Sequence, residues 1–459
     1  MTVLMALSAV AHAVAYVERF VSRARRLNGC ASYKSVACFA MTLAAMPAAS
    51  AQAVLVEEIR ALHREAAERI ALRDNHDILL ARIGIRAADA ALEVANAAPN
   101  PTLTIQTAGI NPRLGIGSGD LRSKTVDTSV RIDQLFERGG KRALRAQSAG
   151  FVSDAMRYDA ADATRQVSQA VRQSYFDLLA AREKVSLVQR SAVLYEQTMD
   201  AARKRARAGD LAPADVSRLS VDALRASNDV VQAQADVVRA RRVLAALMGH
   251  PEVAEVIDPA DPWPALVNPP AVDVEEIVSG RADVQAARLR IASAERSWRL
   301  ALASRTRDVS VGIQADHYPT SAGNQQGAGN SFSISLQVPL FVQYDFNGEI
   351  RAADISLAMA RQTYEKTRDA ARSEVLRVLH DWRVAADRLT RYQEELLPAA
   401  TRSAASAEFA FAHGALGIMD VLDVRRTLHQ TEIETLSARV DFAKASTISV
   451  RTELEKARQ

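Results

Sequence analysis

Cysteine and aromatic residues are scarce in this sequence. Only two cysteines, Cys30 and Cys38, occur in 459 residues, and both lie near the N-terminus. Without cysteine in the rest of the chain, neither a disulfide framework nor a thiolate metal site is possible there. Aromatic residues make up 5% of the chain although hydrophobic residues make up 48%. This composition, with its abundant alanine, suits long and closely packed helices better than a large aromatic core.

Long apolar runs and an excess of one charge are also missing. Outside the N-terminus no apolar run approaches the roughly 18 residues of a membrane-spanning helix, which excludes a helical inner-membrane protein. The formal net charge is +4. Residues 1–51 carry this whole excess, because the basic and acidic residues of the remaining chain balance. A basic footprint for nucleic acid is therefore absent, and nucleic acid is excluded as a partner.

Residues 1–51 have the features of an export signal. A basic stretch that ends at Lys34 precedes the apolar run Val36–Met46, and Ala49-Ser50-Ala51 follows with small residues at alternate positions. This order is typical of a signal peptide with its cleavage site. We predict that the mature protein begins near Gln52, the alternative being an N-terminal core helix.

The next 200 residues alternate between helical and strand patterns. Residues 53–98 predict a helix, which the pair Pro99 and Pro101 must end. Strands are predicted at 102–107 and 125–136, and in the second of these apolar and polar residues alternate strictly. Such a strand has one apolar face, which covers a core in a soluble sheet and faces lipid in an outer-membrane barrel.

An unusually long helix is predicted to follow. The helical pattern runs from about 141 to 207 without proline, which corresponds to a length on the order of 100 Å. The residues from Gly209 to Pro213 predict a turn, and a returning helix spans about 214–248. Six prolines between His250 and Pro270 predict a linker.

The second half of the chain repeats this order. Gly209 and Gly414 stand 205 positions apart, as do Asp215 and Asp420. Strands are predicted at 309–316 and 331–338, and a second long helix at about 349–412, interrupted by Pro398. We interpret the register as a duplication, with a signal peptide at 1–51, a first repeat at 52–249 (hairpin about 101–136), a linker at 250–272 and a second repeat at 273–459 (hairpin about 309–341).

Four amphipathic strands cannot close a membrane barrel. An open edge in lipid leaves backbone groups unsatisfied, and the smallest closed barrels have about eight strands. The chain must therefore oligomerise if its strands span a membrane, and two, three or four copies would give 8, 12 or 16 strands. The predicted fold class is mainly α with a membrane β-barrel part, in which long helices continue the barrel as a tube.

Several motifs resemble the TolC-like outer-membrane efflux protein family over nearly the whole mature length. They are Pro99-Asn-Pro101, Gly139-Gly-Lys-Arg142, Val338-Pro-Leu-Phe341, Glu395-Leu-Leu-Pro398 and the stretch from Gly414 to Asp423. The resemblance implies a homotrimer with a 12-stranded barrel in the outer membrane and an α-helical barrel in the periplasm. It further implies a passive exit duct whose partners are outer-membrane lipid, a periplasmic adaptor (a membrane fusion protein) and an inner-membrane efflux pump.

Two aspartates near the second turn are the first candidate site residues. Asp420 and Asp423 lie one helical turn apart, so both carboxylates share one face. The resemblance places this face at the periplasmic aperture, where three copies would form acidic rings that filter ions. The alternative is a simple preference of Asp for a helix N-terminus. The first copy has Asp215 and Arg218 at these positions, which would present a mixed-charge turn to an acidic neighbour.

The turns themselves are the second candidate site. Gly209 with Leu211, and Gly414 with Leu416, mark the two helical tips. Glycine there permits the left-handed conformation that ends a helix, and the resemblance adds contact with the adaptor.

Motifs for catalysis, cofactors and metal ligation are missing. The eight histidines are scattered, without a close pair suited to a metal ion, so no catalytic residue, cofactor or metal site is predicted. The competing hypotheses are a periplasmic coiled-coil adaptor or scaffold and a soluble enzyme. The stretch from Gly139 to Arg142 and the segment 341–349 resemble the heavy-metal cation-efflux (CzcC-type) branch. Heavy-metal cations are therefore the expected substrate, with drugs or other small organic molecules as the alternative.

Overall fold

The computed structural model describes residues 59–110, 126–209, 211–318 and 329–446. The predicted signal peptide and the outer loops of both hairpins lie outside the described residues. The described residues from Ala61 onward form one compact unit.

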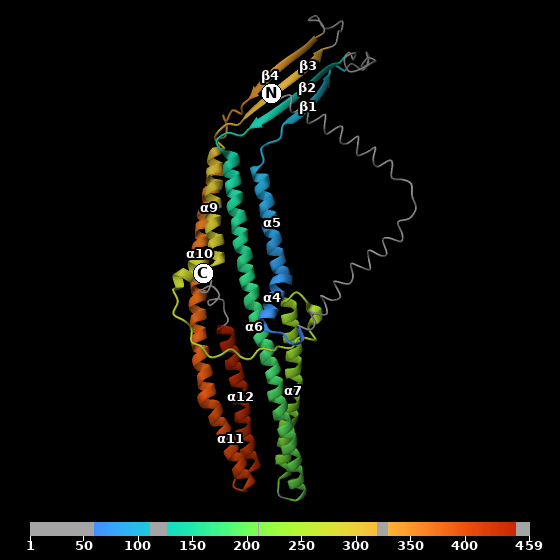
Figure 1. The fold of residues 1–459 in the computed structure, drawn as a ribbon, viewed down its shortest axis with the longest axis vertical. Helices are drawn as coiled ribbons and strands as arrows, with labels where there is room; N and C mark the ends of the chain where they lie inside the picture. The colour runs from blue at the N-terminus through green and yellow to red at the C-terminus, as the bar shows by residue number, and fades with distance from the viewer. Residues whose placement is uncertain (1–58, 111–125, 210, 319–328, 447–459) are drawn as a thin grey trace, which may run out of the picture. The chain divides into compact units, whose positions relative to one another are not determined.

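Long helices and one small sheet make up the unit (Figure 1). The helices are α4 (Arg64–Asp74), α5 (His76–Asn96), α6 (Lys141–Arg207), α7 (Pro213–Leu247), α8 (Val274–Gly280), α9 (Ala282–Ala303), α10 (Asn347–Arg391), α11 (Leu397–Ala412) and α12 (Ile418–Ser446). The strands are β1 (Thr102–Ala108), β2 (Asp127–Phe136), β3 (Val309–Tyr318) and β4 (Gly329–Gln337). The predicted α6, α7 and four strands are therefore confirmed to within a few residues at each end.

The four strands form one antiparallel sheet in the order β1-β2-β3-β4. One row of its register joins Leu103, Ile132, Ile313 and Ile334 across all four strands. The neighbouring row joins Thr104, Arg131, Gln314 and Ser333. Because side chains alternate between faces along a strand, one face of the sheet is apolar and the other polar.

Two sets of helices meet along α6. On the side of the sheet, α6 packs between α5 and α9, and α10 packs on α9. Toward the other end, α6 packs with α7 and α12, and α12 packs with α11. The 67 residues of α6 run through both sets without interruption, so this helix is the common support of the unit. Among the described residues, no helix combines the length and apolarity that crossing a membrane requires.

The predicted helix at 53–98 is wrong in one respect, because the structure has two helices there. Asn75 separates α4 from α5 with an extended backbone (φ −63°, ψ 131°), and its side chain accepts hydrogen bonds from the N–H groups of Asp77 and Ile78. An N-cap of this kind starts a new helix. The sequence pattern missed it because both helices continue the same alanine-rich composition. Arg281 separates α8 from α9 with nearly the same backbone angles (φ −63°, ψ 138°).

The predicted interruption near Pro398 is confirmed. Helix α10 ends at Arg391, a π-helical turn covers Tyr392–Leu396, and α11 begins at Leu397. Proline has no N–H to donate to the carbonyl one turn before it. The wider π-helical turn accommodates that missing bond, so the chain continues as a helix past the proline.

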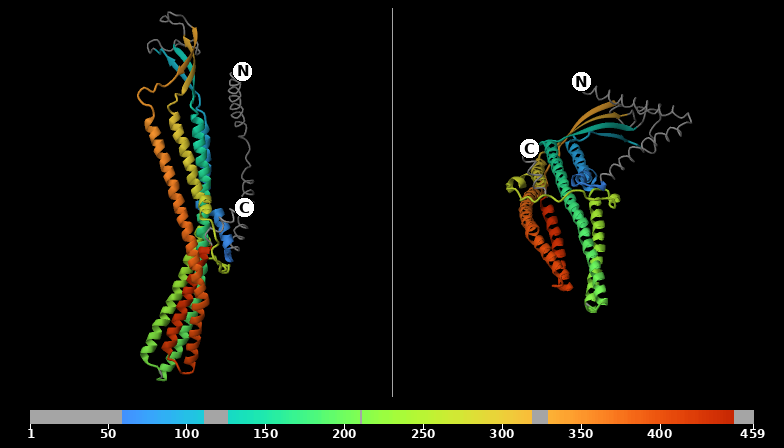
Figure 2. Two further views of the ribbon diagram at one scale, coloured as in Figure 1. Left: turned by 90° about the vertical axis from the view of Figure 1, so that its left-hand side faces the viewer. Right: turned by 60° about the horizontal axis from the view of Figure 1, so that its bottom comes forward.

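The proline-rich segment at 250–272 is irregular, apart from the 3-10 turn Pro251–Val253, and it is anchored at several points. The Trp263 indole N–H donates to Glu183 on α6 (2.6 Å), and the Trp382 indole N–H donates to the carbonyl of Val267 (3.0 Å). Figure 2 shows α4 and this segment on one side of the helices. The segment thus acts as a strap that binds α6 and α10.

Candidate functional site

Two helical tips lie at the end of the unit opposite the sheet (Figure 1). Gly209 (φ 86°) follows α6 and Gly414 (φ 78°) follows α11, both in the left-handed region that glycine tolerates best. Leu211 and Leu416 are half-buried in the turns after them.

One hydrophobic cluster joins the two tips. Met199 and Ala202 on α6 and Leu219 on α7 pack with Ile418 and Leu422 on α12. Leu211 packs against this cluster from the first turn. Burying a leucine, isoleucine or methionine side chain stabilises by about 1.5–3 kcal/mol. The tips of the two halves are therefore held together within one chain, which the sequence alone did not indicate.

Asp420 and Asp423 lie on the exposed side of α12 beside this cluster. Both residues are exposed, while Val421 and Leu422 between them are buried. In the part of the chain that the structure describes, neither carboxylate has a cationic partner within 4.0 Å. Their charges are thus available to solvent and to passing ions, as an ion filter requires.

Asp215 and Arg218 occupy the corresponding positions on α7. Asp215 is half-buried in the first turn of α7, and Arg218 is exposed. Within the described residues the structure does not pair these two side chains with each other or with Asp420 and Asp423. The charges of this turn are therefore not neutralised by Asp420 or Asp423 of the same chain.

An ion pair deeper in the tips was not predicted. Arg426 on α12 donates to Asp222 on α7, whose side chain is nearly buried. Burial alone would lower the pKa of Arg426, but the bond with Asp222 outweighs it and the net pKa is raised. Arg425 beside it pairs with Glu408 on α11 (2.9 Å). These bonds tie α12 to α7 and to α11. Asp222 and Arg426 stand 204 positions apart, and only the cluster of charges after Asp423 hints at them.

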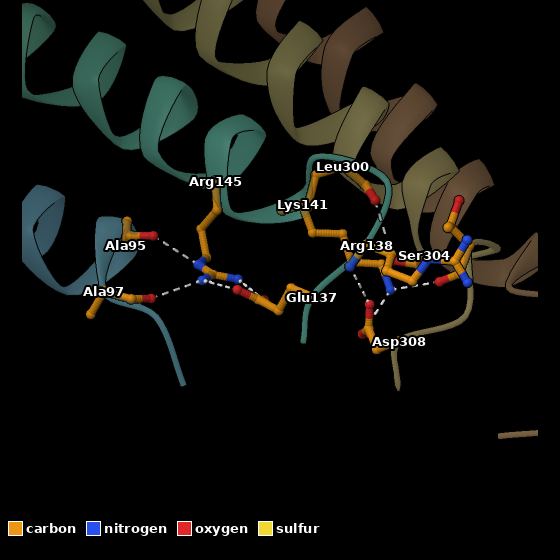
Figure 3. Close-up of polar contacts among 10 residues, drawn as sticks. Ala95, Ala97, Glu137, Arg138, Lys141, Arg145, Leu300, Ser304 and Asp308 are labelled. Atoms are coloured by element: carbon orange, nitrogen blue, oxygen red, sulfur yellow. Dashed lines mark hydrogen bonds and ion pairs between the residues drawn. The ribbon is translucent and has the colours of Figure 1, made fainter. Parts of the chain in front are cut away.

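The junction of the sheet and the helices contains the Gly139-Gly140-Lys141-Arg142 motif (Figure 3). The Lys141 ammonium, almost buried, donates to the carbonyl of Thr306 (2.8 Å) and to Asp308 (2.9 Å). Gly139 has φ 70°, and a Cβ on it would lie 3.0 Å from Thr306. Glycine thus suits both the left-handed backbone and the close approach of the segment after β2 to the segment before β3, and Lys141 then bridges the two halves.

A second ion pair completes the junction. Arg145 on α6 donates to Glu137 (2.8 Å) and to the carbonyl of Ala95 at the end of α5 (3.0 Å). The Arg145 hydrogen bond holds the pKa of Glu137 below its usual range. Burial alone would raise the pKa of Asp308, but Lys141 outweighs it and the net pKa is lowered. Both carboxylates stay charged at neutral pH and fix the sheet on the helices.

The apolar face of the sheet remains exposed. Ile313 is 60% exposed and Ile334 81% exposed. A face of this kind on a monomer in water marks a surface that contacts lipid or another protein.

The sequence was compared with known families. The model of the outer membrane efflux protein family matches residues 69–250 and 274–447. These two matches cover most of the chain. The chain belongs to the outer membrane efflux protein family. It is thus an outer-membrane efflux channel, and the resemblance in its motifs is confirmed.

Individual relatives agree with this assignment. The chain is 25% identical over 346 residues to the cobalt-zinc-cadmium resistance protein CzcC of Cupriavidus metallidurans, covering 73% of this chain and 79% of that protein. It is 24% identical over 400 residues to the pyoverdine export outer membrane protein OpmQ of Pseudomonas putida, covering 82% of each. A crystal structure of CusC has the same fold, with a TM-score of 0.70, 19% identity and coverage of 86% of this chain and 92% of that chain.

Proposed function

We propose that three copies of this chain form a closed duct, with a 12-stranded barrel in the outer membrane and a helical barrel in the periplasm. The observation that carries this proposal concerns the sheet and each set of helices. Each has two outer sides that the other described elements leave uncovered. β1 and β4 are the free edges of the sheet. An unpaired edge is not tolerated in lipid, and joining β1 of one copy to β4 of the next removes every edge.

The helices support the same closure. On the side of the sheet the outermost helices are α5 and α10, and each has exposed apolar side chains. Leu80 and Val94 on α5 are 64% and 75% exposed, and Ile355 and Met359 on α10 are 60% and 65% exposed. Packing α5 of one copy on α10 of the next would bury both apolar faces.

A second apolar stripe lies on α7. Val221, Leu224, Val231 and Val238 are all exposed, at spacings of three and seven residues that place them on one helix face. Helix α11 forms the opposite flank at this level. The stripe thus supplies the contact that would close the tube near its tips.

The tips would then form the periplasmic entrance. Three copies of Asp420 and Asp423 would form two acidic rings that attract cations, and Arg218 would face the acidic tip of the next copy. Gly209 with Leu211, and Gly414 with Leu416, would contact a periplasmic adaptor that joins the duct to an inner-membrane efflux pump. Passive conduction through such a duct needs no catalytic residue and no cofactor.

Heavy-metal cations are the proposed substrate. The likeness to a cobalt-zinc-cadmium resistance protein and the acidic charge of Asp420 and Asp423 both favour cations. Small organic molecules are the second candidate, which the likeness to a pyoverdine export protein favours.

We also propose that the chain is exported and duplicated. Cleavage after Ala51 would release a mature protein that starts at Gln52, with repeats at 52–249 and 273–459. N-terminal sequencing of protein from the membrane fraction tests the cleavage site. A start at Met1 would contradict it.

Two experiments test the duct. Native mass spectrometry of the protein from outer membranes should give a trimer, and a monomer or a soluble periplasmic protein would overturn the proposal. Deletion of the gene should sensitise cells to cobalt, zinc and cadmium. Sensitisation to organic compounds alone would favour the second candidate.

A further inference from the structure

We infer that a cavity beside α4 is a binding site for a neutral saccharide. The cavity has a volume of about 410 Å³ and lies between the start of α4, α6 and the strap. Its lining residues are His63, Arg64, Glu65, Phe176, Asp261, Pro262, Trp263 and Pro264. Its volume lies in the range of small-molecule sites, roughly 300–1,000 Å³. The site is separate from the tips, and the inference does not depend on conduction through the duct.

One wall of the cavity is rigid and flat. The Trp263 indole, which is only partly buried, stacks on the buried ring of Phe176, with an interplanar angle of 17° and centroids 6.2 Å apart. Pro262 and Pro264 flank the indole, and its N–H is fixed by Glu183. Flat aromatic surfaces that are already held in place pack against the C–H face of a sugar ring at little entropic cost.

A chain of hydrogen bonds that ends on a buried tyrosine holds the rim in place. Asp261 accepts from the backbone N–H of Arg64 (2.6 Å) and contacts the His63 imidazole (2.6 Å). Its own backbone N–H donates to the hydroxyl of Tyr175 (3.0 Å), which donates to the carbonyl of Leu62 (2.9 Å). Tyr175 is fully buried. This framework is therefore built before any ligand arrives.

The charges of the rim favour a neutral ligand with hydroxyl groups. Arg64 offers donors, while Glu65 and Asp261 offer acceptors, so the lining has two carboxylates and one guanidinium. A phosphate or another strong anion would be repelled by the carboxylates, and an apolar ligand would bury them without partners. A sugar ring donates hydroxyl protons to the carboxylates, accepts from the guanidinium, and places its apolar face on the indole.

Titration of the purified full-length protein in detergent with N-acetylglucosamine trimer tests the site. Calorimetry should show binding, and Glu65→Gln should weaken it by about tenfold, as expected for the loss of a hydrogen bond to a charged group. Glu255→Gln, which changes an exposed carboxylate outside the cavity, is the matched control and should bind as the wild type does. Absence of binding at millimolar trimer, or equal affinity in Glu65→Gln, would overturn the inference.

Tryptophan fluorescence locates the ligand. The chain has three tryptophans, and the trimer should change the emission of the wild type but not that of Trp263→Phe. An unchanged response in Trp263→Phe would place the ligand elsewhere and refute the site. An unrelated neutral tripeptide should give no heat, and equal binding of that peptide would also refute it.

A further experiment identifies the polymer from which the saccharide comes. Sedimentation with purified cell-wall glycan and with lipopolysaccharide distinguishes the two surface polymers, and Glu65→Gln should reduce whichever association is observed. Association with either polymer that Glu65→Gln leaves unchanged would contradict the inference. Because these assays use isolated protein, a failed duct would leave their outcome unaffected.

Discussion

The first long helix and its counterpart 205 positions later are built differently. Helix α6 runs through 67 residues without interruption, whereas α10 and α11 are joined by the π-helical turn Tyr392–Leu396. Both lead to a tip that ends in glycine. The continuous helix fixes one tip relative to the sheet. The interrupted helix concentrates bending at one turn, because π-helical hydrogen bonds are less regular. The second long helix therefore has a turn that accommodates a proline, whereas α6 has none.

A proline introduced at position 193 of α6 should have the largest effect on the difference between the two long helices. Val193 on α6 is 52% exposed and stands 205 positions before Pro398. Val193→Pro should lower the free energy of unfolding by about 3 kcal/mol, because it removes one helical hydrogen bond and adds a clash. Thermal unfolding followed by circular dichroism measures the loss.

The controls for this prediction use the same two positions. Val193→Ala should change stability little, since the side chain is half in solvent. Pro398→Ala should change stability by less than about 1 kcal/mol, because the turn already tolerates the missing bond. Equal losses for Val193→Pro and Pro398→Ala would show that the two helices are not distinct.

The unequal charges of the tips give the second prediction. Asp420→Asn with Asp423→Asn should reduce the preference for cations over anions roughly fivefold, if the carboxylates stabilise a passing cation by about 1 kcal/mol. Single-channel recordings in planar bilayers measure this preference. Asp215→Asn in the first tip is the matched control and should have a smaller effect. Unchanged selectivity in the double variant would rule out the filter.

The turns that start the two long helices provide the third prediction. Gly140 before α6 (φ 68°) and Phe346 before α10 (φ 64°) are both left-handed. A Cβ on Gly140 would meet nothing within 4 Å, so Gly140→Ala costs only the left-handed backbone strain, about 1 kcal/mol.

The control variant, Gly84→Ala, should change the stability in the opposite direction. Gly84 lies inside α5, also with nothing within 4 Å of a Cβ. Gly84→Ala should stabilise the protein by about 0.5–1 kcal/mol, because alanine restricts the unfolded chain more than glycine does. Chemical denaturation of both variants checks the pair, and a shift in the same direction for both would refute the explanation.

The smallest effect concerns the joints between the short helices. His250 contacts Asp74 (2.9 Å) and Glu252 (3.0 Å) beside the joint at Asn75. Burial lowers the pKa of His250, but the two carboxylates outweigh it and the net pKa is raised. At the second joint Arg281 pairs with Asp283 (2.8 Å) and stays charged at every accessible pH.

A raised histidine pKa fixes the sign of the pH effect. The stability from His250 is complete below the unfolded pKa, near 6.5, and is lost as pH rises through the higher folded pKa. The protection factors of the α4 amides, which correct for the base-catalysed rise in intrinsic exchange, should therefore fall between neutral and mildly alkaline pH, and those of the α8 amides should not. His250→Asn should abolish the difference, and its persistence in that variant would exclude His250 as the cause. The effect should stay below about 1 kcal/mol, since the pair is partly solvated.

Periodicity was enough to predict the long helices and the strands. The helical pattern without proline predicted α6 nearly to its ends. The strict alternation of apolar and polar residues predicted β2 and its exposed apolar face. The break at Asn75 was missed, because a side-chain cap inside a uniform helical composition leaves no change of period. The anchoring of the strap was also missed, because its prolines indicate only irregular backbone, whereas Trp263 and Trp382 contact residues far away in the sequence.

The placement of the candidate site residues was predicted only in part. The spacing of Asp420 and Asp423 put both on one face of α12, because it depends on one helix alone, and their role at an aperture stays a proposal. The pair of Asp222 and Arg426 depends on how α7 meets α12, and no local pattern encodes that contact. The role of Lys141 was likewise hidden, since its partner Asp308 belongs to the other half of the chain.

The outward apolar face of the sheet also bears on how the protein is made. In water this face and its two free edges would attach to any similar surface, so a lone copy is prone to aggregate. In the proposed duct, barrel closure would protect the two edges and entry into lipid would protect the apolar face, so neither step alone would protect both. Biogenesis of such a duct would therefore have to couple chain association to insertion and keep the unassembled population small.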